Sequence, residues 1–186
     1  MAFWSNAQSE AKRNYRFKIT INAFDGYNGE GKTTSVWWAK TTSLPSFEVS
    51  EIEHNHLDNK YYYPGRVSWN EVAMTLVDPI SPDATDMIND LLERSGYKIP
   101  SSPENAANKS TISKKTAANL GDVQIDIVDG EGTTIETWVL KRPFIKSAKF
   151  GDLDYSNDDL KQLDISFRYD WATCSNSANE RFNFAD

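Results

Sequence analysis

Hydrophobic and polar residues alternate over two long stretches in the middle of the chain, which are joined by an aromatic segment. Residues 44–56 and 67–78 interleave β-branched and aromatic residues with polar ones, a pattern typical of β-strands. Residues 57–66 between them are rich in tyrosine and end in Pro-Gly-Arg, so we predict a loop there. Neither set of alternate positions in these strands is cleanly apolar. Such strands are expected where one face packs on the core and the other on a partner subunit or a polar channel.

The same two-residue period predicts strands in most of the remaining chain. Glycine-containing turns at residues 25–31 and 129–132 are expected to return the chain as hairpins. Together with the strands at 44–56 and 67–78, these segments amount to about eight strands, mainly paired as hairpins. This number and pairing indicate an antiparallel β-sandwich or a partly closed β-barrel. The additional strands are predicted at residues 15–23, 33–42, 123–127, 135–140, 144–150 and 163–171.

One segment has helical rather than strand periodicity. Ser81 is the predicted N-cap, Pro82 the first helical residue and Gly96 the left-handed C-cap. The helix is expected to pack as a lid over an open end of the sheets. Its apolar positions form one narrow stripe, consisting of Met87, Ile88, Leu91 and Leu92.

Length and composition indicate one folded globular domain. The 186 residues are enough for a single well-filled core, which we place at 14–172. Residues 97–119 have the composition of a long loop, and 173–186 form a polar C-terminal tail.

Charge and cysteine content limit the possible partners. The net charge of −7 and the pI near 4.9 argue against nonspecific binding to nucleic acid or to an anionic membrane surface. The single cysteine, Cys174, excludes an internal disulfide and a cysteine-based zinc cluster, and it fits a reducing compartment. Neither a signal peptide nor a membrane-spanning run is visible, so folding in a cytoplasm is expected.

Three motifs resemble chemical sites, and each has a simpler interpretation. Residues 26–33 match the phosphate-binding pattern G-x-x-x-x-G-K-[ST], but a strand-like sequence follows where a helix is required, so a glycine-rich turn is favoured. His54 and His56 share one strand face and could hold a metal, yet solvated histidines at a strand end are the better interpretation. The acidic turn at 152–159 lacks the glycine and glutamate of a calcium loop.

We therefore predict no catalytic residue, no cofactor and no metal. No Ser-His-Asp or Cys-His set is detectable, so the protein is expected not to be an enzyme.

The ordered set of segments resembles the tail tube proteins of contractile-tailed bacteriophages. The resemblance covers about residues 14–172 and is carried by the whole order rather than by one motif. It departs at the glycine-rich first turn, the 97–119 loop and the tail beyond Cys174. The matching segments are Leu44-Pro45, the acidic strand, Pro64-Gly65-Arg66, residues 69–78 (WNEVAMTLVD), the helix, Thr137-Trp138, Pro143-Phe144-Ile145, residues 151–155 (GDLDY) and Tyr169-Asp170-Trp171.

The resemblance implies a structural virion protein that assembles into stacked six-fold rings. Subunits would share one β-barrel around a channel, forming the inner tail tube through which DNA passes without specific binding. The implied partners are other copies of the chain, the tail sheath, the baseplate with its tube initiator and the tape-measure protein. The implied locations are the virion and, during assembly, the host cytoplasm.

Within this interpretation two groups of residues are candidate sites. The carboxylates expected to line the channel are Glu48, Glu51, Glu53 and Glu71. The main contact between subunits or rings is expected to consist of Leu57, Asp58, Asn59, Lys60, Tyr61, Tyr62, Tyr63, Pro64, Gly65 and Arg66.

Three other functions remain open from the sequence. One is a tube or tube-initiator protein of a baseplate, tailocin or secretion needle without DNA cargo. Another is a monomeric β-sandwich binding module whose six tryptophans form a ligand face. The last is a nucleotide-hydrolysing enzyme built on residues 26–33.

Overall fold

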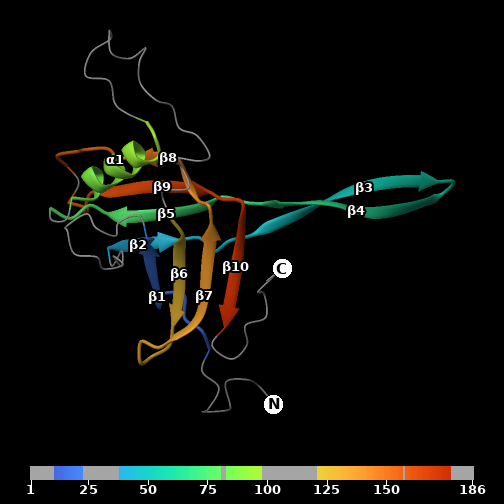
Figure 1. The fold of residues 1–186 in the computed structure, drawn as a ribbon, viewed down its shortest axis with the longest axis horizontal. Helices are drawn as coiled ribbons and strands as arrows, with labels where there is room; N and C mark the ends of the chain where they lie inside the picture. The colour runs from blue at the N-terminus through green and yellow to red at the C-terminus, as the bar shows by residue number, and fades with distance from the viewer. Residues whose placement is uncertain (1–10, 23–37, 81–82, 98–120, 157, 177–186) are drawn as a thin grey trace, which may run out of the picture.

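The described chain forms two antiparallel β-sheets, from which a long β-hairpin projects (Figure 1). The computed structural model describes residues 11–22, 38–80, 83–97, 121–156 and 158–176. One sheet has the strand order β1-β6-β7-β10 and the other β2-β5-β9-β8, while β3 and β4 pair only with each other. The elements are β1 (Phe17–Ile21), β2 (Ala39–Thr42), β3 (Phe47–His56), β4 (Asn59–Trp69), β5 (Val72–Val77), α1 (Ala84–Arg94), β6 (Val123–Val128), β7 (Thr134–Lys141), β8 (Phe144–Lys149), β9 (Gln162–Arg168) and β10 (Trp171–Asn176).

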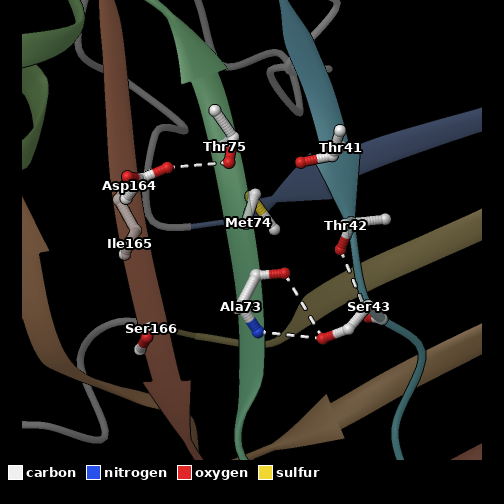
Figure 2. Close-up of a pocket in the computed structure, with 9 residues that line it drawn as sticks. All are labelled: Thr41, Thr42, Ser43, Ala73, Met74, Thr75, Asp164, Ile165 and Ser166. Atoms are coloured by element: carbon white, nitrogen blue, oxygen red, sulfur yellow. Dashed lines mark hydrogen bonds between the residues drawn. The ribbon is translucent and has the colours of Figure 1, made fainter.

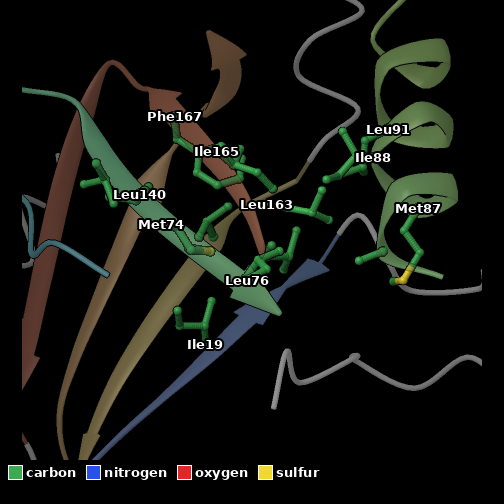
Figure 3. Packing of buried hydrophobic residues seen from close by; sticks show 14 of the residues in the cluster. Ile19, Met74, Leu76, Met87, Ile88, Leu91, Leu140, Leu163, Ile165 and Phe167 are labelled. Atoms are coloured by element: carbon green, nitrogen blue, oxygen red, sulfur yellow. The ribbon is translucent and has the colours of Figure 1, made fainter. Parts of the chain in front are cut away.

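The core lies between the two sheets, whose strands cross steeply in Figure 1. Alternate residues of β5 and β9 are buried, as the two-residue period predicts. Each large apolar side chain that is fully buried stabilises the fold by about 1.5–3 kcal/mol. The buried residues include Ile19, Ile125 and Leu140 from one sheet and Met74, Leu163 and Phe167 from the other. All of these except Ile125 are labelled in Figure 3.

The predicted helix is confirmed, with a different N-terminus. Asp83 is the N-cap, because its carboxylate accepts hydrogen bonds from the backbone N–H groups of Thr85 and Asp86. Ser81 and Pro82 lie outside the described residues. The C-cap is Ser95, and the next residue, Gly96, has the positive φ predicted for it, 105°. Met87, Ile88 and Leu91 are buried in the core cluster, so the helix covers the sheets as expected.

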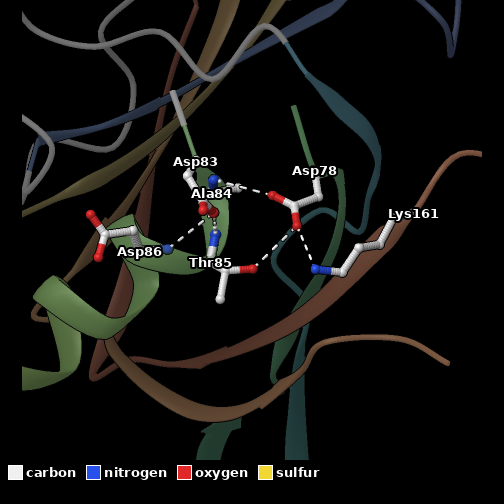
Figure 4. A network of polar contacts seen from close by, with 6 residues as sticks. All are labelled: Asp78, Asp83, Ala84, Thr85, Asp86 and Lys161. Atoms are coloured by element: carbon white, nitrogen blue, oxygen red, sulfur yellow. Dashed lines mark hydrogen bonds and ion pairs between the residues drawn. The ribbon is translucent and has the colours of Figure 1, made fainter. Parts of the chain in front are cut away.

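A carboxylate at the end of β5 ties this helix to the sheet (Figure 4). Asp78 accepts hydrogen bonds from the Ala84 backbone N–H at 3.2 Å and the Thr85 hydroxyl at 3.2 Å, and it pairs with Lys161 Nζ at 2.7 Å. Burial of Asp78 acts to raise its pKa, but the hydrogen bonds and the charge of Lys161 outweigh it and hold the pKa below its usual value.

The mainly β, antiparallel class with one flanking helix is confirmed in the described chain, whose sheets are open and do not close into a barrel. Strand pairing differs from the prediction in two respects. β2 does not return beside β1, because β1 pairs with β6 and β2 with β5. The patterns at 67–78 and 163–171 are each divided between two sheets, β4 with β5 and β9 with β10, so the described strands outnumber those expected. No helix in the described residues is long and apolar enough to span a membrane.

The predicted loop at 57–66 is wrong. The turn consists of only Leu57 and Asp58, with Leu57 at φ 52°, and residues 59–66 continue as β4. Tyr61, Tyr62 and Tyr63 pair across the ribbon with β3, which suits the strand preference of aromatic residues.

Candidate interaction surface

The β3–β4 hairpin is a ribbon that extends far beyond the two sheets (Figure 1). All ten residues of β3 are exposed, and so are all residues of β4 except Trp69. A two-stranded hairpin is marginally stable by itself, because it has no second layer on which to bury side chains. The described part of the chain provides no such layer, since β3 and β4 pair only with each other.

The ribbon carries an unusual amount of exposed apolar and aromatic surface. Exposed apolar side chains gathered on one element are characteristic of an interaction site. Tyrosines are especially effective in interfaces because they combine a rigid apolar ring with a hydroxyl group. The exposed fractions are 57% for Phe47, 48% for Val49, 62% for Ile52, 90% for Leu57, 49% for Tyr61, 56% for Tyr62, 57% for Tyr63 and 57% for Val67.

Aromatic and polar contacts fix the base of the hairpin to the body. The rings of Phe47 and Trp69 lie 5.4 Å apart, and Trp69 lies 6.0 Å from the ring of buried Tyr169. The Asn70 side-chain amide donates to Ser46 Oγ at 3.3 Å and to Glu48 Oε1 at 3.2 Å. These contacts join the base of the ribbon to Asn70 and Tyr169, which lie outside it.

A β-bulge divides the ribbon into two parts. Pairing shifts between Val49 and Glu51, so that Gly65 and Arg66 of β4 both lie opposite Ser50. The Arg66 backbone N–H donates to Ser50 Oγ at 2.9 Å. A Cβ atom at Gly65 would lie 2.3 Å from Ser50 Oγ and 2.9 Å from the Ser50 carbonyl oxygen, so the close approach requires glycine.

The predicted contact residues 57–66 all lie in the outer part of this ribbon, from its turn to the bulge. Tyr61, Tyr62 and Tyr63 are exposed as the contact requires, whereas Lys60 already pairs with Glu53 at 2.9 Å. Sequence reasoning missed Phe47, Val49, Ile52 and Val67. A signal was present, because the apolar positions in 47–52 change from odd to even residue numbers instead of keeping one strand face.

The four predicted channel carboxylates do not come together in one chain. Glu51 and Glu53 share a face of β3, whereas Glu48 lies on the other face. Glu71 lies outside the hairpin, where its carboxylate binds Lys146 and lies 3.8 Å from Arg168. Their position relative to a channel stays a prediction.

Two of the three motifs considered from the sequence, the histidine pair and the acidic turn, lie within the described residues, apart from residue 157 of the turn. His54 and His56 are exposed near the hairpin turn, and the described residues contain no group of three or more ligands that could hold a metal. Asp154 accepts hydrogen bonds from the Ser156 backbone N–H and hydroxyl, which lower the Asp154 pKa in an exposed turn. Residues 26–33 lie outside the described chain.

An open groove runs over the outer face of β2, β5 and β9 (Figure 2). It has a volume of about 350 Å³ and is lined mainly by small and hydroxyl-bearing residues, including Ser43, Ala73 and Ser166. The one ionisable side chain in its lining, Asp164, accepts a hydrogen bond from the Thr75 hydroxyl at 2.7 Å. This hydrogen bond joins directly opposite positions of β5 and β9.

The cysteine is poorly suited to nucleophilic chemistry. Burial raises the pKa of the Cys174 thiol, and the neighbouring carboxylate of Glu136 raises it further. The thiol therefore stays protonated at neutral pH, while reactive cysteines are thiolates.

Comparison with known proteins shows the fold. No family model and no curated protein matches the sequence. Three solved structures contain chains that match along nearly their whole length, at 13–16% identity. The chain shares their fold.

The first match is a chain of the anti-feeding prophage tube-terminating cap, with a TM-score of 0.61 and 16% identity over 95% of this chain and 100% of the other. The second is a chain of the six-fold symmetrised anti-feeding prophage baseplate, with a TM-score of 0.60 and 13% identity. The match covers 90% of this chain and 97% of the other. The third belongs to the sheath–tube complex of an extracellular contractile injection system, with a TM-score of 0.58 and 16% identity. The match covers 95% of this chain and 99% of the other.

Proposed function

We propose that this chain is a structural tail-tube subunit without enzymatic activity. Copies assemble into stacked hexameric rings, which form the inner tube of a contractile tail and conduct DNA from the capsid to the host cell. One observation carries the proposal: a ribbon of exposed aromatic and aliphatic side chains that the described chain does not cover. The fold shared with chains of contractile injection systems supports it.

The open sheets favour the same assembly. In the described residues, one sheet ends at β1 and β10 and the other at β2 and β8. Edge strands present unpaired backbone groups that can pair with another chain. A ring in which subunits contribute strands to one barrel would remove such edges, as barrels do.

The net charge suits a conduit for DNA. Six chains of −7 give 6 × −7 = −42 for one ring. An acidic channel would repel phosphates, so DNA would slide without being retained. We place Glu48, Glu51, Glu53 and Glu71 among the candidate lumen positions, and of these Glu51 and Glu53 have a common orientation.

The proposed partners follow from this role. They are further copies of the chain, the tail sheath around the tube, the baseplate with its tube initiator and the tape-measure protein. The protein would reside in the virion after assembling in the host cytoplasm.

A second function is a tube or tube-initiator protein of an injection particle without DNA cargo. The matched solved structures favour it, since they are of a baseplate, a tube-terminating cap and an injection-system sheath–tube complex. Identification of the contents of purified particles, as DNA or as protein, separates the two.

Negative-stain electron microscopy of the purified protein across a concentration series tests the assembly. Six-fold rings or hollow tubes are expected, with wild-type protein diluted below the assembly threshold as the monomer control. A monodisperse monomer at every concentration, including after addition of preformed baseplates as nuclei, would contradict the tube function and favour a monomeric binding module.

A further inference from the structure

The two sheets of the described chain differ in how regular their edges are. In the sheet β1-β6-β7-β10, both outer strands pair with their neighbours without a register shift. In the sheet β2-β5-β9-β8, both outer pairs contain a register shift, between Ala39 and Thr41 in β2 and between Ile145 and Ser147 in β8. Bulges, short strands and lysines are features that keep an edge strand from pairing with another chain.

The composition of the edge strands follows the same division. β10 has six residues and no charged side chain, and β1 has five residues, of which only Lys18 is charged. β2 is only four residues long and contains Lys40, and β8 contains Lys146 and Lys149. The edges at β1 and β10 are therefore the less protected ones. They also carry no carboxylate that would repel a second chain of net charge −7.

The hydrogen bonds at the two ends of β1 show which of its backbone groups point to the outer edge. Asn22 N–H donates to the Asp122 carbonyl at 3.2 Å, and Val128 N–H donates to the Arg16 carbonyl at 3.1 Å. Successive residues of a strand direct their N–H and C=O groups to opposite sides, and the register is regular between these two bonds. The even-numbered residues of β1 therefore bond to β6. The residues that direct their backbone groups to the outer edge are Phe17, Ile19 and Ile21.

The same alternation identifies the outward backbone groups of β10. Because β6 bonds to β1 through even-numbered residues, it bonds to β7 through odd-numbered ones, as in the pair Ile125–Trp138. β7 then uses its odd-numbered residues toward β10, as in the pair Val139–Thr173. The residues of β10 that direct their N–H and C=O groups to the outer edge are Ala172, Cys174 and Asn176.

We propose that β10 of one copy pairs with β1 of the next, so that the sheet β1-β6-β7-β10 continues from chain to chain around the ring. The inference rests on the proposed ring assembly and specifies which strands join its subunits. All strand pairs in this sheet are antiparallel. Four such strands end in two edges of opposite direction, so copies related by rotation bring β1 beside β10 as an antiparallel pair. The two edges differ, so the contact is heterologous, and a ring closes it.

A matched position for a test lies on the edge of the other sheet. Asp78 N–H donates to the Lys161 carbonyl at 2.9 Å, so β9 bonds to β5 through odd-numbered residues and to β8 through even-numbered ones. Ser166, an even-numbered residue, pairs with Ser147 of β8. The backbone groups of the next residue, Ala148, are therefore directed to the outer edge.

Proline substitution of two alanines tests which sheet joins the copies. Proline lacks a backbone N–H, and at Ala148 or Ala172 it removes only a donor that is directed to the outer edge. Both alanines are partly buried against the core, so the two substitutions make similar demands on the fold. In the full-length chain, Ala172→Pro should raise the concentration needed for assembly at least several-fold, and Ala148→Pro should leave it unchanged. Sedimentation velocity measures that concentration, and circular dichroism checks the fold.

Amide hydrogen exchange of the wild-type chain, resolved to single residues, is a second test that needs no substitution. The amides of Ile19, Ala172 and Cys174 should exchange rapidly in the monomer and slowly in rings, because each then donates to the neighbouring copy or lies inside the new pair. The Ala148 amide should keep its monomer rate in rings.

Normal assembly of Ala172→Pro, or loss of assembly in Ala148→Pro, overturns the inference. Slow exchange of the Ala172 and Cys174 amides already in the monomer, or rapid exchange of both in rings, overturns it as well. Microscopy of the wild-type samples separates this failure from that of the tube function: rings without the expected protection overturn the inference alone, and absence of rings overturns both.

Discussion

Single residues set the geometry on which the ribbon depends, and Gly65 is the clearest case. Its Cα lies against the main chain of Ser50, in the bulge where two residues face one. The backbone there leaves no room for a side chain, because the Ser50 carbonyl oxygen cannot move aside as a flexible side chain would.

Gly65→Ala is therefore expected to distort the bulge, at a cost on the order of 1–3 kcal/mol. The hairpin lies outside the core, so thermal unfolding of the body should change little while the concentration needed for assembly rises at least several-fold. Sedimentation velocity measures that concentration. Gly130→Ala is the control, since its Cβ would meet only the flexible end of Arg16 at 3.3 Å. Normal assembly of the Gly65→Ala variant would show that the bulge is dispensable.

Asp78 controls stability at acidic pH. Its folded pKa is lowered, so its contribution is present above the unfolded pKa of about 3.9 and is lost as pH falls through the folded pKa. Asp78→Asn should lower stability at neutral pH by about 1–3 kcal/mol and flatten the decline below about pH 4. Thermal melts from pH 7 to pH 3 measure both effects. The exposed Asp152→Asn variant is the control, and equal pH profiles for wild type and Asp78→Asn would contradict the assignment.

At the scale of elements, the outer part of the hairpin is separate from the core. In the described chain no buried residue of the core cluster comes from β3 or β4, and Trp69 at the base of β4 packs against the cluster from outside. Changes on the ribbon should therefore affect association while leaving the fold of the chain intact.

Replacing Tyr61, Tyr62 and Tyr63 together with serine should leave folded monomers that no longer form tubes. Removal of three exposed rings eliminates anchors of the interface, and the core is untouched. Circular dichroism checks the fold and electron microscopy checks assembly. Tyr155→Ser is the matched control, because this exposed tyrosine lies in the β8–β9 connection. Tubes of normal length from the triple variant would refute the role of the tyrosines.

At the scale of the whole molecule, the charge of −7 per chain opposes assembly. Salt screens this repulsion, with a Debye length of about 30 Å at 0.01 M and about 8 Å at 0.15 M. Light scattering across this range should show assembly at a lower protein concentration in higher salt. Assembly that weakens with salt would indicate that ion pairs rather than apolar contacts hold the rings together.

Lysine in place of Glu51 should make the channel retain nucleic acid without dissolving the tube. The substitution reverses a charge on an exposed strand position for which no ion pair is described. DNA release from assembled particles should slow, and tubes should bind DNA in a salt-dependent manner. Glu71 is a poor choice for this test, because its loss would leave Lys146 without its partner. Unchanged release kinetics would argue against a lumen position for Glu51.

The sequence by itself determined the mainly β class, the antiparallel pairing of the strands, and the position and C-terminal end of helix α1. Alternation in β5 and β9 marks the buried face correctly, because side chains in a strand alternate whatever the partner is. The sequence also predicted that the tyrosines of the central segment are surface residues. However, it predicted a loop at residues 59–66, which form part of β4. The turn at Leu57-Asp58 lacks the usual glycine or asparagine signal, although Leu57 adopts a positive φ.

Only the tertiary structure decided which strands pair and where strands change sheet. The patterns at 67–78 and 163–171 look continuous, yet the chain turns near Asn70 and Asp170, and the pieces join different sheets. Periodicity reports which face a residue occupies along one strand, while pairing depends on long-range contacts between distant segments. The bulge at Ser50 became evident for the same reason, because it is a property of two strands together.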